Sequence, residues 1–133
     1  MSEHIFVKKM DKSTFQHEGT GVPKKIQKYW RIDHMKPKEN MQIILQHNGK
    51  NYKATMRCDN LKRTRLIWQS DFRNVIHERY MELAIQYQNE EEVDTAPRMH
   101  FVRIGENKYI VNFVDVVKGE NIKVKETFPQ KIT

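Results

Sequence analysis

Three cations stand close together in the stretch Asp59–Trp68, at positions 62, 63 and 65. The guanidinium groups of Arg63 and Arg65 are planar and carry paired N–H donors, which fit phosphate oxygens and the acceptor edge of guanine. Gln69 follows directly, and a glutamine amide can make the corresponding paired contact to adenine. Charge clusters are also common as solvated surface. The cluster therefore indicates either recognition of a polyanion or a solvated strand end.

Other residue types offer little for catalysis. The six histidines stand at 4, 17, 34, 47, 77 and 100, and no two of them have the four-residue spacing of a helical metal site. Cys58 is alone, and Gly19-Thr20-Gly21 lacks the lysine of a phosphate loop. We therefore expect no metal, no cofactor and no catalytic residue in this chain.

One pattern is similar to a nuclease site. Asp94 followed by Glu106-Asn107-Lys108 has the spacing of two carboxylates and a lysine around a magnesium ion. Residues 105–108 also have the composition of a tight hairpin turn, which explains the same residues by local structure. A small metal-dependent nuclease is thus kept as a minor alternative.

The net charge of +7 is unevenly distributed. Residues 1–88 hold 17 Lys and Arg against 9 Asp and Glu, whereas residues 89–133 hold 7 against 8. Such asymmetry suits a polyanionic partner, either nucleic acid or an anionic membrane surface. No run approaches the ~20 apolar residues of a membrane span, and the strongest amphipathic segment has only two cations, so we expect no membrane partner. The single cysteine favours a reducing, cytoplasmic location.

Hydrophobic periodicity predicts the elements that position these cations within one domain, residues 1–133. Residues 41–58 predict the clearest hairpin, because Asn48-Gly49 separates two apolar runs and the return strand alternates, with Lys53, Thr55 and Arg57 outward. Residues 11–21 and 31–40 are expected to be loops. The expected strands are 4–10, 41–46, 51–58, 62–68, 99–104, 109–117 and 122–125, and the expected helices are 22–30 and 70–88.

Seven short strands and two helices in this order indicate a mainly β, α+β domain. Several antiparallel hairpins with few helices are typical of a seven-stranded open β-barrel and not of a doubly wound sheet. In the helix at 22–30, Val22, Ile26, Tyr29 and Trp30 are expected to share the core face. The helix at 70–88 is expected to support the basic strand that precedes it.

Three segments resemble a known family. Residues 5–13 (Ile-Phe-Val-Lys-Lys-Met-Asp-Lys-Ser) and 22–30 (Val-Pro-Lys-Lys-Ile-Gln-Lys-Tyr-Trp) are similar to the start of the effector domain of EcoRII-type restriction endonucleases. Residues 62–68 are similar to its second basic arm. The resemblance covers residues 4–30 and 57–73, and it implies the DNA-binding pseudobarrel shared with plant transcription-factor domains. It also implies that two arms enter the major groove of duplex DNA, with any nuclease activity in a fused or associated domain.

Carried over by position, the resemblance implies a set of DNA contacts at one end of the sheet. The first arm comprises Lys9, Asp11, Lys12, Ser13, Phe15, Gln16 and His17. The second arm comprises Asn60, Lys62, Arg63, Arg65, Gln69 and Ser70. Phosphate contacts fall to Lys24, Lys25 and Lys28.

A different class of function remains open. Trp30 and Trp68 could stack on bases in an RNA-binding or modified-base-binding barrel. Their spacing also places both on core faces of their elements, which is the commoner situation for tryptophan. Double-stranded DNA is therefore the expected partner.

Overall fold

The computed structural model describes residues 3–93, 95–115 and 130–132. Twelve elements are found in these ranges. They are β1 (Glu3–Lys9), α1 (Lys12–Gln16), β2 (Gly19–Gly21), α2 (Lys24–Tyr29), β3 (Asn40–His47), β4 (Lys50–Cys58), β5 (Thr64–Trp68), α3 (Ser70–Arg79), α4 (Met81–Gln88), β6 (Arg98–Gly105), β7 (Lys108–Val114) and β8 (Gln130–Ile132).

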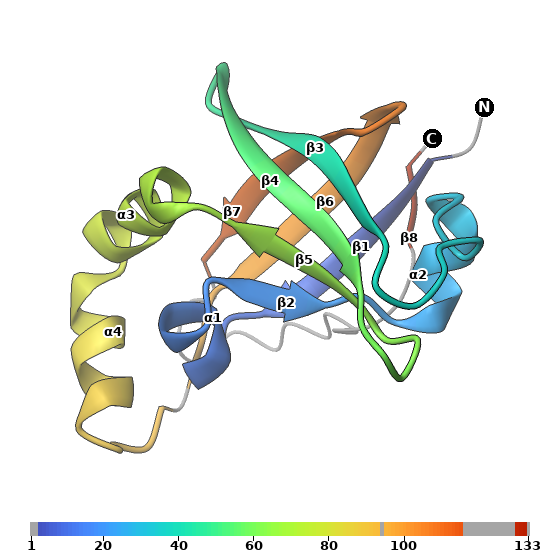
Figure 1. The fold of residues 1–133 in the computed structure, drawn as a ribbon. Helices are drawn as coiled ribbons and strands as arrows, with labels where there is room; N and C mark the ends of the chain where they lie inside the picture. The colour runs from blue at the N-terminus through green and yellow to red at the C-terminus, as the bar shows by residue number, and fades with distance from the viewer. Residues whose placement is uncertain (1–2, 94, 116–129, 133) are drawn as a thin grey trace.

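All eight of these strands belong to one curled sheet. Their order is β2-β5-β4-β3-β7-β6-β1-β8, and the β3–β7 pair is parallel while the other neighbouring pairs are antiparallel. The sheet bends into an open barrel, with α2 at one side and α3 and α4 at the other (Figure 1). The expected fold class, a mainly β α+β open barrel, is confirmed.

The β3–β4 hairpin forms as expected from its turn. Asn48 and Gly49 both have positive φ angles, 50° and 77°, which the tightest two-residue hairpin turns require. In the register that follows, Ile43 lies opposite Ala54, and both are buried. The alternation of the sequence therefore places one face of this hairpin in the core and leaves Arg57 on the other face.

Aromatic side chains fill the barrel from both sides. Trp30, which ends α2, lies 4.7 Å from the ring of Tyr109 and 5.8 Å from that of Phe6, between ring centroids. Phe72 of α3 packs 5.7 Å from Trp68 at the end of β5. All five rings are at most 1% exposed. The two helices thus close the barrel with aromatic contacts.

The segment expected to be an eleven-residue polar loop, 11–21, folds instead into α1 and β2. Asp11 caps α1 through a reciprocal capping box with Thr14, whose backbone N–H donates to the Asp11 carboxylate at 3.1 Å. Phe15 is buried, at 6% exposure, and anchors this short helix. A single buried aromatic residue in a polar run gives little periodicity, which is why the sequence pattern did not reveal the helix.

The helix expected over residues 70–88 is interrupted at Tyr80, which has φ −124° and ψ 44°. The Tyr80 hydroxyl donates to Asp115 at 2.6 Å, and its ring lies 5.7 Å from that of Phe113 at the end of β7. These contacts with a distant strand turn the chain, so α3 and α4 replace one continuous helix. The two expected helices therefore become three, α2, α3 and α4, and α1 brings the helices of the described residues to four.

Six of the seven expected strands are present with small shifts at their ends. The remaining strand, 122–125, lies outside the described residues, and β2 and β8 were not expected. Within the expected helix 22–30, Val22, Ile26 and Trp30 are buried as predicted, but Tyr29 is 47% exposed. Tyr29 lies at the end of α2 and faces away from the barrel interior.

Candidate nucleic-acid interface

Four of the expected contact residues meet in one groove. Lys24 of α2, Lys62 and Arg63 of the β4–β5 loop, and Arg65 of β5 line an open pocket of about 460 Å³. Asp59 is the one carboxylate among the lining residues. Segments almost forty residues apart in the sequence therefore present cations to the same space. We call this pocket the basic groove.

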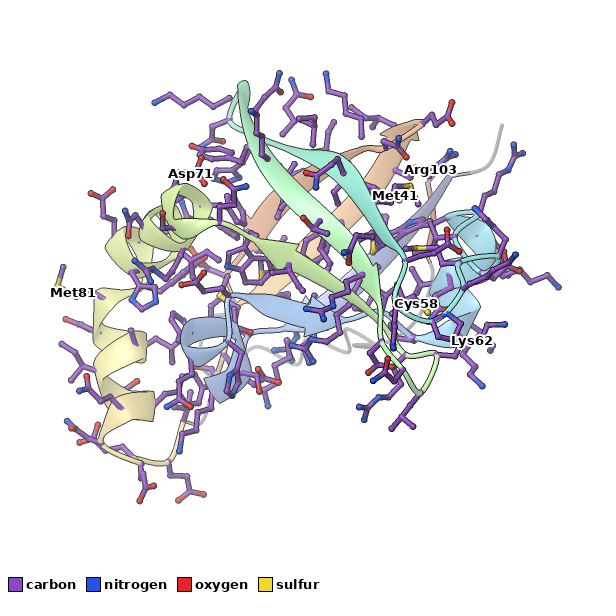
Figure 2. All side chains as sticks on the ribbon, in the orientation of Figure 1. Met41, Cys58, Lys62, Asp71, Met81 and Arg103 are labelled. Atoms are coloured by element: carbon purple, nitrogen blue, oxygen red, sulfur yellow. The ribbon has the colours of Figure 1, made fainter. Side chains whose placement is uncertain are left out.

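The β4–β5 loop is held in shape by Asp59. Its carboxylate accepts hydrogen bonds from the backbone N–H groups of Leu61 and Arg63, at 2.9 and 2.8 Å, and from Arg63 Nε at 2.8 Å. These bonds, led by the one from the Arg63 backbone, lower the pKa of Asp59. Lys62 adopts a φ of 60° in this loop and is exposed (Figure 2). Arg63 is 71% exposed despite its ion pair.

Helix α2 is fixed beside this loop by buried contacts on its other face. Ile26 is fully buried, and the Gln27 side chain donates to the Val22 carbonyl at 2.7 Å. The Val22 N–H in turn donates to the Thr64 carbonyl at 2.9 Å, which joins the start of α2 to β5. The three lysines of α2, Lys24, Lys25 and Lys28, are all exposed. Their expected role as phosphate contacts stays a prediction.

The sheet register adds Arg57, a cation that the sequence did not single out as a contact, to the neighbourhood of Arg65. Arg65 on β5 lies opposite Arg57 on β4 and opposite Gly21 on the edge strand β2. Like charges directly opposite each other destabilise a sheet, so this pair favours a partner that neutralises it. A Cβ added at Gly21 would meet nothing within 4 Å, so open space lies next to Arg65 on this side. Alternation placed Arg57 outward, but only the β4–β5 register places it beside Arg65.

The first arm is a helix whose inner residues are structural. Phe15 packs against His77 and Tyr87, with ring centroids 5.5 and 5.7 Å apart. Its burial corrects the expectation that its ring is presented to DNA. Asp11 is half-buried. Its carboxylate already caps α1 and forms an ion pair of 3.1 Å with Lys8. The exposed residues of this arm are Lys12, Ser13, Gln16 and His17.

Helices α3 and α4 hold the first arm in place. Arg73 of α3 forms an ion pair of 2.6 Å with Glu18, and His77 contacts the Phe15 carbonyl at 3.3 Å. Lys12 lies 3.6 Å from Glu90, just after α4. The helical region 70–88 was expected to support only β5. In the structure, α3 and α4 also support α1.

The first arm and the β4–β5 loop of the second arm lie at opposite ends of the β2–β5 pair, not at the same end as expected. The Trp68 N–H donates to the Glu18 carbonyl at 2.9 Å, so α1 adjoins the end of β5. Gln69 and Ser70 are exposed at this end, while Lys62 lies at the other end (Figure 2). At ~3.3 Å per residue, the five residues of β5 separate the two ends by roughly 13 Å. That span is close to the ~12 Å width of the major groove.

Four expected contacts, Lys9, Lys25, Lys28 and Asn60, neither line the basic groove nor belong to the residues at the α1 end of the β2–β5 pair. Lys9 is at the end of β1, opposite Arg98 of β6, and does not line the basic groove. Asn60 is exposed in the β4–β5 loop without lining the groove. The Gln69 side chain makes no capping hydrogen bond although it stands at the N-cap of α3, so its amide is available for other contacts.

The alternatives receive little support from the described residues. Trp30 and Trp68 are each 1% exposed, so neither ring is available for stacking on a base. Asp94 lies outside the described residues, and Glu106 and Asn107 form the β6–β7 turn. Within the described ranges no three His, Cys, Asp or Glu side chains are grouped so that they could hold a metal ion.

No helix in the described part of the chain is long and apolar enough to cross a membrane.

The fold and the groove define a class: an α+β open barrel with cations along one sheet edge. Among solved structures, the N-terminal domain of Helicobacter pylori LlaJI.R1 shares this fold, with a TM-score of 0.57, 10% sequence identity and 98% of each chain covered. At this identity the likeness concerns the fold alone. No family model matches the sequence, and no curated protein matches it significantly.

Proposed function

We propose that this protein binds double-stranded DNA sequence-specifically, through two arms placed in the major groove. The observation that carries the proposal is the basic groove, where Lys24, Lys62, Arg63 and Arg65 converge beside the β2–β5 edge. The opposed pair of Arg57 and Arg65 supports it, because a polyanion would relieve the repulsion between them.

The side chains at the two ends of the β2–β5 pair differ in chemistry, so the two ends are suited to different contacts with DNA. Lysines at the basic groove are suited to phosphates, and they position a domain without reading sequence. Gln16, His17 and Gln69 at the other end carry amide and imidazole groups suited to base edges. Arg65, which lines the basic groove near the start of β5, is suited to the paired acceptors of guanine.

The biological setting follows from the resemblance of residues 4–30 and 57–73 to EcoRII-type effector domains. The fold shared with the N-terminal domain of H. pylori LlaJI.R1 agrees with a pseudobarrel of this kind. In this proposal the protein is the recognition domain of a restriction endonuclease, or a stand-alone relative. DNA cleavage then belongs to a fused or associated nuclease domain.

Selection from a randomised duplex library at moderate salt tests the proposal. The library is divided into methylated and unmethylated pools, and a pool of single strands serves as the competing substrate. The expected result is enrichment of one short duplex motif. Equal binding of enriched and scrambled duplexes would contradict sequence-specific recognition, and a preference for single strands would instead favour an RNA-type or single-strand function.

A further inference from the structure

A second polar pocket lies at the other end of α2 and shares no lining residue with the basic groove. It has a volume of about 390 Å³ and opens between the end of α2, the start of β3 and the β6–β7 turn. Met41 and Arg103, both of which line it, lie close together on the side of the barrel that carries α2 (Figure 2). A cavity of this size accommodates a small molecule.

Hydrogen-bond donors dominate the polar lining of this pocket. Arg31, Arg103, His34 and Asn107 contribute side chains that can donate, and Glu106 is the one carboxylate among the lining residues. Tyr109 adds a hydroxyl: burial raises its pKa to about 12, and the opposing hydrogen bond from Arg103 does not reverse that rise. The hydroxyl therefore keeps its proton at neutral pH and can donate.

Arg31 occupies a backbone position at which helices favour glycine. The Ile32 N–H donates to the Gln27 carbonyl at 2.9 Å, and the Arg31 N–H donates to the Lys28 carbonyl at 3.2 Å. These two bonds define a Schellman motif, in which the residue after the C-cap takes a left-handed conformation. Arg31 has the corresponding φ of 58°. No ion-pair partner for its guanidinium occurs among the described residues.

The backbone position by itself does not mark a site, because the chain repeats it after α4. There the Glu91 N–H donates to Gln86 at 2.9 Å, the Glu90 N–H donates to Tyr87 at 3.2 Å, and Glu90 has a φ of 57°. Glu90 lines none of the pockets described here, whereas Arg31 lines one beside a second arginine. The cavity and its donors, and not the strain, therefore distinguish Arg31.

We propose that this pocket binds a phosphate group through Arg31 and Arg103, with Tyr109 as a further donor. Two guanidinium groups can each offer paired N–H donors to phosphate oxygens, which is the strong form of this contact. The phosphate belongs either to a free nucleotide or to the backbone of a long DNA duplex that extends beyond the basic groove. Binding of a free nucleotide does not depend on the proposed function, because the two pockets share no lining residue, whereas the DNA source rests on that function.

Calorimetric titration of the whole protein with inorganic phosphate and with a nucleoside 5′-monophosphate tests the first source. Arg31→Gly is the decisive variant, because glycine fits the left-handed position and the denaturation midpoint should stay unchanged or rise. Binding should weaken about tenfold or more in Arg31→Gly and in Arg103→Lys. Glu90→Gly, which makes the same backbone change elsewhere, should bind as the wild type does. Glu106→Gln should bind phosphate more tightly, because it removes the opposing charge.

Duplexes of two lengths test the second source. One duplex has the length needed to saturate the basic groove, and the other is twice as long. If the phosphate belongs to DNA, Arg31→Gly weakens binding of the longer duplex only. It also lowers the salt slope of that binding by about 1. A wild-type protein that binds neither phosphate nor the nucleotide, together with Arg31→Gly affinities equal to wild type for both duplexes, would overturn the proposal.

Discussion

The hydroxyl of Tyr87 in α4 donates a 2.9 Å hydrogen bond to the backbone carbonyl of Met10, where β1 ends and the first arm begins. The two residues are 77 positions apart in the sequence. The bond joins α4 to the first arm, which is proposed to enter the major groove. A rigid arm loses less conformational entropy on binding, so this contact bears on affinity as well as on stability.

Tyr87→Phe should therefore lower the free energy of unfolding by about 1 kcal/mol, because a part-buried carbonyl loses its partner. Backbone amides of α1 should exchange faster with solvent, which hydrogen-exchange measurements report. Tyr52→Phe, which keeps the ring packing against Phe72, is the matched control. Unchanged exchange in α1 would show that Tyr87 does not hold the arm.

Substitutions of two neighbouring residues of α1 should affect different properties, one the stability of the fold and the other the binding of DNA. Phe15→Ala should destabilise the fold by about 3 kcal/mol, because its ring packs in a buried site. Gln16→Ala, at an exposed position, should leave denaturant unfolding unchanged but weaken binding of the selected duplex. A Gln16→Ala protein that binds the selected and scrambled duplexes with wild-type selectivity would exclude this residue from base reading.

The facing arginines make a prediction in which stability and binding diverge. Arg57→Ala should raise the free energy of unfolding by a few tenths of a kcal/mol, because it removes a like charge opposite Arg65. It should nevertheless weaken DNA binding. Arg65→Ala should cost about 1–3 kcal/mol on the selected sequence and relax selectivity. Lys50→Ala, at the start of β4 and outside the lining of the basic groove, is the control for nonspecific charge loss. Binding is measured by fluorescence anisotropy at several salt concentrations.

Asp59→Asn separates the shape of the β4–β5 loop from its charge. The Asn carbonyl can still accept the bonds from the Leu61 and Arg63 backbone, while the ion pair to the Arg63 side chain is lost. Affinity for all duplexes should rise, and the salt slope should increase by about 1, because Arg63 is freed for phosphate. Weaker binding on every duplex would indicate that the ion pair itself orders the loop for contact.

Acid unfolding should report the cap of α1. Burial alone would raise the pKa of Asp11, but the hydrogen bond and charge of Lys8, with the bonds from Thr14, outweigh it and lower the pKa below 3.8. Because the folded pKa is the lower one, this contribution to stability is complete above the unfolded value near 3.8. It is lost as the pH falls through the folded pKa. Denaturation midpoints of Asp11→Asn should accordingly fall less steeply below pH 4 than those of the wild type, and parallel curves would contradict this account.

Local patterns in the sequence predicted the features that short-range physics controls. The Asn48-Gly49 turn required positive φ angles and therefore fixed the β3–β4 hairpin, and the spacing of Trp68 placed its ring on a core face. Trp68 is 1% exposed, which confirms that prediction. Residues 12–16 were expected to lie in a loop and were not recognised as a helix, because five residues with one buried ring have no readable period.

The sequence by itself determined the class of fold, the concentration of cations in the first two thirds of the chain and the basic stretch that ends in β5. Only the tertiary structure decided which cations meet, because strand register and the pairing of β2 with β5 join segments far apart in the chain. It also decided that Tyr80 divides the long helix and that α1 and β2 form in the segment expected to be a loop. Those outcomes depend on packing between distant residues, which no local spacing in the sequence encodes.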